Sequence, residues 1–160
     1  MRSMKNNPEH SMPHHLRGAF RGFETALARY LETLDVPLSY FYIIRQQWDG
    51  TGYSQSLLAA KSFMTESVAS QVIKKMIGEG LLRREKDETD GRAWTIHLTE
   101  KGRNLREDVV VQGIGISTTY APDLSREDIF TTINVLKKIR AAFDAYNEKY
   151  LQDQASEGSQ

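Results

Sequence analysis

Polar side chains recur along residues 65–75 in a pattern that suits contacts with DNA. Hydroxyls, an amide and two cations fall on the opposite or flanking sides of an apolar stripe, and such groups bind base edges and phosphates in a major groove. These candidate contacts are Thr65, Ser67, Ser70, Gln71, Lys74 and Lys75. Glu66 is left out because its carboxylate would repel phosphate. A solvated helix face would show the same polarity, so the neighbouring elements have to decide between the two interpretations.

Two flanking segments extend this set of candidate DNA contacts. In Asp90-Gly91-Arg92 a carboxylate stands two residues before a guanidinium at the tip of a predicted hairpin. An arginine in that position can enter an adjacent minor groove. Arg84 and Lys86 are near enough to contact phosphates, although an ordinary charged turn would have the same composition. The start of the preceding predicted helix completes the set with Ser54, Gln55 and Ser56.

Composition narrows the chemistry that the chain can perform. Cysteine is absent, which excludes disulfides, thiolate zinc sites and thiol redox sensing. The 21 basic and 21 acidic residues cancel, so DNA binding would have to rest on clustering of the cations. His14 and His15 are adjacent and point in different directions on a helix, so no metal site is expected. Motifs of known phosphate-binding loops and catalytic nucleophiles do not occur, and we expect neither enzymatic activity nor a cofactor.

The spacing of apolar residues predicts helices before the polar stretch and along it. Residues 16–35 and 37–48 have helical periodicity, and Pro37 suits the first position of the second helix. Ser54 and Thr65 are good N-caps for a short third helix and for a fourth. In the fourth helix the residues expected to face inward are Val68, Ala69, Val72, Ile73, Met76 and Ile77.

After Gly80 the periodicity changes from helical to extended. Residues 81–85 and 93–98 flank a charged segment and are expected to pair as a β-hairpin. Thr99 can cap a fifth helix, and Ser125 begins the last one. Two helices in short succession followed at once by a hairpin describe a winged helix-turn-helix. The predicted fold class is therefore mainly α with a small β-hairpin wing.

Long helices at both ends of the chain lie outside this central module. They cannot all bury their apolar stripes on it, so pairing with a second subunit is expected. We expect a winged helix-turn-helix DNA-binding domain over residues 37–99 and a helical dimerisation region formed by residues 14–36 and 100–150. Residues 1–13 and 151–160 are expected to be a flexible arm and a flexible tail.

Three stretches resemble the signature of the MarR family of transcriptional regulators. They are Gly80-Leu81-Leu82-Arg83-Arg84, Asp87-Glu88-Thr89-Asp90-Gly91-Arg92-Ala93 and Leu98-Thr99-Glu100-Lys101-Gly102. The resemblance covers about residues 16–150 and implies a homodimer that binds a pseudo-palindromic operator. It also implies that Asp90 orients Arg92 for the minor groove. Gly91 departs from the family, which often has a basic residue there.

The same resemblance implies a site for a small, often aromatic or phenolic, anion between the dimerisation helices and the winged module. Arg45 falls where relatives tend to carry an apolar residue, and a ligand carboxylate would supply the partner that a cation needs there. Alternatively, Arg45 extends to solvent or pairs with Glu24. The other candidate effector contacts are His15, Arg17, Phe20, Arg21, Tyr40, Phe41 and Ile44.

The expected function is that of a ligand-responsive transcriptional regulator, most readily a repressor released from its operator by a small aromatic acid or phenol. Its partners would be double-stranded DNA, a second copy of the chain and the effector. The alternative is a winged-helix architectural or protein-interaction module without an effector, which would bind DNA with steep salt dependence and no operator preference, or not at all. The chain has no run of about 18 apolar residues and starts without an apolar stretch, so we expect a cytoplasmic protein.

Overall fold

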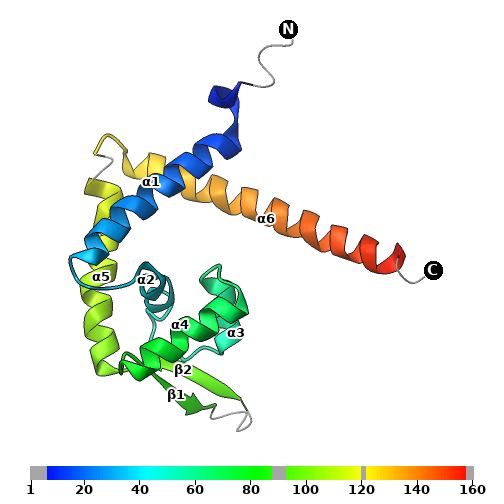
Figure 1. Ribbon diagram of the computed structural model, residues 1–160. Coiled ribbons are helices and arrows are strands. Elements are labelled where there is room, and N and C mark those ends of the chain that lie inside the picture. The colour runs from blue at the N-terminus through cyan, green and yellow to red at the C-terminus, as the bar shows by residue number, and fades with distance from the viewer. Residues whose placement is uncertain (1–6, 88–92, 120–121, 158–160) are drawn as a thin grey trace. The chain divides into compact units, whose positions relative to one another are not determined.

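The computed structural model describes residues 7–87, 93–119 and 122–157, and the side chains of these residues other than 111–119 and 155–157. Helices dominate, and the strands form a two-stranded antiparallel hairpin, which confirms the expected fold class. The elements are a 3-10 helix Pro8–His10, α1 Met12–Glu32, α2 Leu38–Ile44, α3 Gln55–Lys61, α4 Glu66–Gly78, β1 Leu82–Lys86, β2 Trp94–Leu98, α5 Glu100–Thr119 and α6 Arg126–Glu157 (Figure 1). The chain forms two units, Met1–Ser117 and Thr118–Gln160.

One apolar cluster holds the first unit together. Its members come from α1, α2, α3, α4, both strands and α5, so each of these elements contributes to the same core. The fully buried aliphatic side chains are Leu27, Leu31, Ile43, Ile44, Leu58, Ile73, Met76, Leu82, Ile96 and Val109. Burying a side chain of this size stabilises a fold by about 1.5–3 kcal/mol. This core fixes the elements that carry the candidate DNA contacts.

The two predicted N-caps of the helix-turn-helix are confirmed. Ser54 Oγ accepts a hydrogen bond from Leu57 N at 3.2 Å, and Thr65 Oγ1 accepts one from Val68 N at 3.3 Å. An N-cap satisfies an amide that has no partner inside its own helix. The caps therefore fix where α3 and α4 begin, and with that which side chains each helix turns outward.

Residues in the left-handed region end both of these helices. Gly80 has φ +73°, and its amide donates to Ile77 O at 3.0 Å, which confirms Gly80 as the stop after α4. Phe63 has φ +55° in the turn between α3 and α4, and its amide donates to Ala60 O at 3.2 Å. Glycine adopts this conformation freely, whereas a phenylalanine does so at a steric cost.

The hairpin pairs Leu82 with Leu98 and Arg84 with Ile96, so its apolar residues meet on one face. Outside the two strands, Tyr53 forms an isolated antiparallel bridge with Ile96, which was not predicted from the sequence. Ile96 N donates to Tyr53 O at 2.8 Å, and Tyr53 N donates to Ile96 O at 3.2 Å. This pairing joins the chain just before α3 to the hairpin.

Thr99 connects the hairpin to α5 and is confirmed as an N-cap. Its Oγ1 accepts a hydrogen bond from Gly102 N at 3.1 Å and donates to Gly80 O at 2.7 Å. A Cβ atom on Gly102 would lie 2.1 Å from Leu81 O, so α5 meets this backbone at a distance that only glycine allows. The end of α4, the start of the hairpin and the start of α5 are thus joined at one point.

Three helix ends differ from the sequence-based expectations. Helix α1 begins at Met12, inside the segment expected to be a flexible arm, because Pro13 fits the first turn of a helix. Helix α2 ends at Ile44 and does not continue through Trp48, whose side chain is 75% exposed. Helix α6 continues to Glu157, past the end expected for the dimerisation region.

Helix α6 makes up most of the second unit, and most of its large apolar side chains are exposed. Ser125 begins this helix as expected, since Asp128 N donates to Ser125 Oγ at 3.1 Å and Ser125 N donates to Asp128 Oδ2 at 3.0 Å. The side-chain and backbone hydrogen bonds from Ser125 lower the pKa of Asp128. The exposed apolar residues are Phe130, Ile133, Val135, Leu136, Phe143, Tyr146, Tyr150 and Leu151. Among the described residues, no helix has the length and apolar character needed to cross a membrane.

Candidate nucleic-acid interface

Helix α4 presents a polar face opposite its buried stripe. Ala69, Ile73 and Met76 are completely buried. Successive residues turn by about 100° around a helix, so Ser67, Gln71 and Lys74 lie on the opposite side. All three are exposed, whereas the candidate Ser70 is half-buried at the edge of that side. The exposed face therefore offers a hydroxyl, an amide and a cation next to one another, as major-groove contacts require.

Val68 belongs to this outward side, and the expectation that it faces inward is wrong. Its side chain is 47% exposed, because it lies about 100° around the helix from the centre of the buried stripe. Val68 is one turn before Gln71 on the helix surface. An apolar side chain there can contact a thymine methyl group, so Val68 joins the candidate contacts. The exposure of Val68 could have been predicted from the sequence, because its position around the helix is well away from those of Ala69 and Ile73.

The end of α4 is tied to α2 through Tyr40. Its hydroxyl donates a hydrogen bond to Glu79 Oε1 at 2.9 Å. Burial, and then this hydrogen bond and the charge of Glu79, raise the pKa of Tyr40 to about 12. Lys75 Nζ lies 5.9 Å from the centre of the Tyr40 ring, a cation–π distance that places this candidate cation beside α2.

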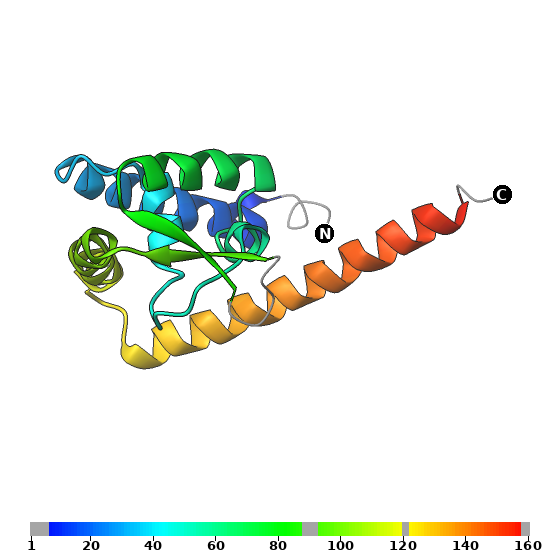
Figure 2. The same cartoon turned by 90° about the horizontal axis from the view of Figure 1, so that it is seen from below.

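Candidate contacts from α3 and β1 meet directly. Arg84 Nη2 donates to Gln55 Oε1 at 2.9 Å. Ser54 Oγ and Ser56 Oγ lie 3.2 Å apart at the start of α3, and Lys86 is exposed at the end of β1. Figures 1 and 2 both show α4 beside α3 and the hairpin. Candidate contacts at the start of α3 and on β1 therefore belong to elements that pack beside α4.

The wing tip, with Asp90 and Arg92, lies outside the described residues. The described base of the hairpin separates its charges by face. Glu85 Oε1 accepts from Arg83 Nε at 2.6 Å, and this hydrogen bond is the main cause of the lowered pKa of Glu85. Because alternate residues of a strand point to opposite sides, Glu85 is directed away from Arg84 and Lys86. The carboxylate therefore does not offset the two candidate phosphate contacts.

The candidate effector contacts of α1 are exposed along the first half of that helix. They are His15, Arg17, Phe20 and Arg21, and the side chain of Phe20 is 54% exposed. The ring Nε2 of His15 lies 2.8 Å from Glu9 O. These side chains lie on a surface of the first unit and do not line the pocket described below.

The candidate effector contacts of α2 are mostly core residues. Tyr40, Phe41 and Ile44 are all buried. Arg45 is exposed, and its guanidinium carbon lies 5.4 Å from the centre of the Phe41 ring. Glu24 Oε1 accepts a hydrogen bond from the Tyr42 hydroxyl at 2.9 Å. Arg45 thus follows the surface over an aromatic ring, as long cationic side chains do when the charge stays in water.

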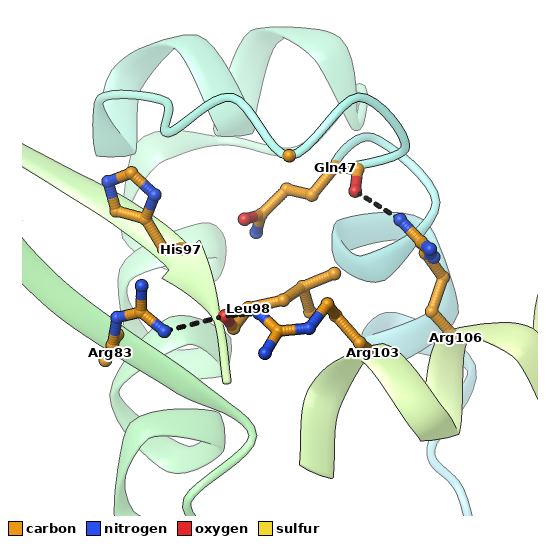
Figure 3. A pocket seen from close by; sticks show the side chains of 7 residues that line it. Gln47, Arg83, His97, Leu98, Arg103 and Arg106 are labelled. Carbon is orange, nitrogen blue, oxygen red and sulfur yellow. Dashed lines mark hydrogen bonds between the residues drawn. The ribbon is translucent and has the colours of Figure 1, made fainter. Parts of the chain in front are cut away.

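A pocket of about 60 Å³ is formed by other residues (Figure 3). They are Gln47, Gly50, Arg83, His97, Leu98, Arg103 and Arg106. These residues come from four separate segments and no local motif links them, so they could not be identified as a site from the sequence. Only the folded chain brings them together.

Comparison with known proteins finds similarity to transcriptional regulators. A family model described as the MarR family matches residues 35–93, which span the helix-turn-helix and β1. The HTH-type transcriptional regulator MgrA of Staphylococcus aureus is 26% identical over 109 residues, which cover 68% of this chain and 73% of MgrA.

Two solved structures show the same fold over most of the chain. CouR of Rhodococcus jostii RHA1, bound to p-coumaroyl-CoA, matches with a TM-score of 0.77 and 18% identity, covering 84% of this chain and 94% of CouR. BpsR of Bordetella bronchiseptica, whose DNA binding is regulated by 6-hydroxynicotinic acid, matches with a TM-score of 0.71 and 19% identity, covering 82% of this chain and 94% of BpsR. At this level of identity the two structures support the winged helix-turn-helix architecture.

Proposed function

We propose that this chain is a transcriptional regulator of the MarR family, and that it acts as a homodimeric, cytoplasmic repressor that a small aromatic acid or phenol releases from a pseudo-palindromic operator. The observation that carries the DNA-binding part is the outward side of α4. Ser67, Gln71 and Lys74 stand opposite a completely buried stripe, at the position of the recognition helix in a helix-turn-helix.

In the proposed complex α4 enters the major groove. Gln71 hydrogen-bonds a base edge, and Lys74 contacts a phosphate. Arg84 and Lys86 at the hairpin base contact the adjacent backbone, and Arg92 at the wing tip enters the minor groove. Ser54, Gln55 and Ser56 at the start of α3 contact the phosphates on the other side of α4.

The proposed dimer is supported by the exposed apolar side chains of α6. Leu136, Phe143 and Tyr146 recur on one side of that helix, and a second copy of the chain would cover them. Two subunits related by a two-fold axis would place two α4 helices in half-sites about one turn of DNA apart. Binding near a promoter would then exclude RNA polymerase.

The proposed effector class is supported by the ligands of the structural relatives and by Arg45. CouR is bound to p-coumaroyl-CoA, and BpsR is regulated by 6-hydroxynicotinic acid. Arg45 is an exposed cation beside the ring of Phe41, and such a pair can receive an aromatic carboxylate. An effector that favours a conformation with misplaced α4 helices would weaken DNA binding, typically by about 1–3 kcal/mol.

The direct test measures binding to a duplex as a function of salt for the full chain and for Lys74→Ala. If Lys74 contacts a phosphate, the variant should bind more weakly to every sequence, and the slope of log affinity against log salt should fall by about one unit. Lys149→Ala on α6 is the matched control, and its salt slope should equal that of the unaltered chain. Equal slopes for Lys74→Ala and the unaltered chain would move the interface away from α4.

The effector proposal is tested by adding aromatic carboxylates and phenols to the same DNA complex. Release by one compound class, reduced in Arg45→Gln, is the expected result. Binding that no compound affects and that shows no sequence preference would favour the alternative, an architectural winged helix without an effector.

A further inference from the structure

Basic side chains from three elements surround the pocket between the hairpin and α5. Arg83 comes from β1, His97 from β2, and Arg103 and Arg106 from α5 (Figure 3). Gln47, in the segment between α2 and α3, closes the pocket from the remaining side. All of these residues belong to the first unit, so the pocket is built within one body of the chain.

The pocket contains a buried hydrogen-bond donor that no protein group satisfies. Gln47 is 2% exposed, and its Nε2 has no hydrogen-bond partner among the described residues. Figure 3 shows its amide directed into the space between His97 and Arg103. A buried donor without a partner is destabilising, so such groups in folded proteins are normally paired. An acceptor atom inside the pocket would satisfy this one.

Two guanidinium groups converge on the wall of the same pocket. Arg83 Nη1 and Arg103 Nη1 both donate to Leu98 O, at 3.2 and 3.1 Å. Two like charges held on one carbonyl oxygen repel each other, and an anion between them would reverse that effect. Each guanidinium has five N–H groups, so donors remain after these contacts.

Carboxylates of the chain neutralise this cluster only at one edge. Among the ion pairs of the described residues, Glu85 contacts Arg83 at 2.6 Å and His97 at 3.4 Å, and none involves Arg103 or Arg106. Arg106 is held in place by backbone oxygens, since its Nη1 donates to Gln47 O at 2.9 Å. The pocket therefore combines an excess of positive charge with cations whose positions are already fixed.

We propose that this pocket binds a compact oxyanion, a carboxylate or phosphate group. The volume of about 60 Å³ holds a few water molecules or one small anion. The anion would accept from Gln47 Nε2 and from the guanidinium groups of Arg83 and Arg103. This site is distinct from the effector site around Arg45, and it adds a second ligand to the proposed regulator.

An anion in this pocket would affect the loop before α3 and the hairpin, which carry candidate DNA contacts. Gly50 lines the pocket in the loop before α3. A Cβ on Gly52 would lie 2.2 Å from the His97 ring, so this loop also rests directly on β2. An anion bound here would connect the start of α3, both strands and α5, and thereby favour one arrangement of the hairpin relative to α3.

The test uses the full chain and inorganic phosphate, with acetate as a second probe and sodium chloride keeping the ionic strength constant. Phosphate should raise Tm saturably and shift the side-chain amide signal of Gln47 in ¹H–¹⁵N spectra. Gln47→Glu places a carboxylate inside the pocket with almost no change in size, and phosphate binding should weaken by about tenfold or more. Gln46→Glu makes the same chemical change at the adjacent, half-buried position and should bind phosphate like the unaltered chain.

A phosphate response equal to that of chloride, or one that persists unchanged in Gln47→Glu, would overturn the proposal. If Gln47→Glu fails to fold, Arg103→Gln with Arg29→Gln as its control decides the question by the same criterion. Acetate and phosphate competing for one site would identify the shared oxyanion chemistry. If DNA alone shifts the Gln47 amide and free phosphate does not, the proposal of a free-anion site fails. DNA affinity in phosphate-free buffer tests the proposed function separately.

Discussion

The first unit and helix α6 bury their apolar side chains to opposite extents. In the first unit, Leu27, Ile43, Leu58 and Ile73 are completely buried. In α6, by contrast, Phe143 is 55% exposed and other large apolar side chains are exposed with it. Helices with apolar residues at the same spacing thus differ in whether those residues are buried.

An apolar stripe in the sequence therefore does not by itself show which surface the helix packs against. The stripe of α4 is covered by elements of the same unit that lie before and after it in the chain, so it forms part of a core within one subunit. Most large apolar side chains on the described part of α6 are exposed, as is expected of a surface that associates with another molecule. If α6 forms the proposed dimer interface, stability and assembly depend on separate regions, and variants should affect one without the other.

The largest expected effect comes from the buried stripe. Ile73→Ala should reduce the free energy of unfolding by about 2–5 kcal/mol, because it removes methyl groups from a completely packed site and leaves a cavity. Val68→Ala, on the exposed side of the same helix, should change it by less than about 0.5 kcal/mol. Urea unfolding measures both. Equal losses in the two variants would contradict the assignment of the two sides of α4.

A charge on the exposed stripe of α6 should affect assembly instead. Phe143→Lys should weaken dimerisation by about a hundredfold, since a buried lysine in an apolar interface has no partner. The near-ultraviolet circular dichroism of the helix-turn-helix core should not change. Analytical ultracentrifugation measures the association. Ala145→Lys adds the same charge on the opposite side of α6 and serves as the control, so a monomeric Ala145→Lys would show that α6 does not pair through the Phe143 side.

Substitution of Gln71 in the proposed interface should change the preference for particular DNA sequences. Gln71→Ala should reduce discrimination at one base pair of each half-site by about 1–3 kcal/mol, because a bidentate amide contact is lost. Dimerisation and the free energy of unfolding should stay as they are, since Gln71 is exposed and outside the core. Competition binding with single-base operator variants provides the measurement. A preference that is unchanged at every position would place base readout elsewhere.

The smallest expected effect concerns the contact between α2 and the end of α4. Tyr40→Phe removes the hydrogen bond to Glu79 and should reduce the free energy of unfolding by about 1 kcal/mol at neutral pH. Burial and Glu79 raise the pKa of Tyr40 from 10.0 to about 12 in the folded chain. The stabilising contribution of Tyr40 is therefore complete below pH 10 and is lost as pH rises towards 12, since the unfolded chain loses this proton first.

The difference between Tyr40→Phe and the unaltered chain should accordingly shrink between pH 10 and 12. Chemical unfolding at a series of pH values measures it. A difference that stays constant up to pH 12 would contradict the raised pKa of Tyr40.

Local chemistry predicted much of this fold from the sequence. Ser54, Thr65 and Thr99 were identified as N-caps and Gly80 as a stop, because each acts on backbone groups within a few residues of itself. The change from helical to extended periodicity located the hairpin for the same reason. The architecture then followed from the order of the elements.

The remaining features depend on segments that meet only in the folded chain. The pairing of Tyr53 with Ile96 involves a single residue, which leaves no periodic pattern in the sequence. Helix α2 ends before Trp48. The carbonyl of Gln47, in the segment that follows α2, accepts a hydrogen bond from the Arg106 guanidinium, which lies far along the chain. The convergence of Arg83, His97 and Arg103 on one pocket is likewise a product of tertiary packing. Local sequence carries no signal for such contacts.

The central claim is that a dimer of this chain reads a specific DNA sequence through α4. Selection of genomic DNA fragments on the purified full chain tests it most directly, with Gln71→Ala and Phe143→Lys selected in parallel. We predict enrichment of one palindrome whose half-sites lie about one helical turn apart, a relaxed palindrome for Gln71→Ala and none for Phe143→Lys. Uniform recovery of fragments that depends only on salt, or the same palindrome for all three proteins, would contradict it.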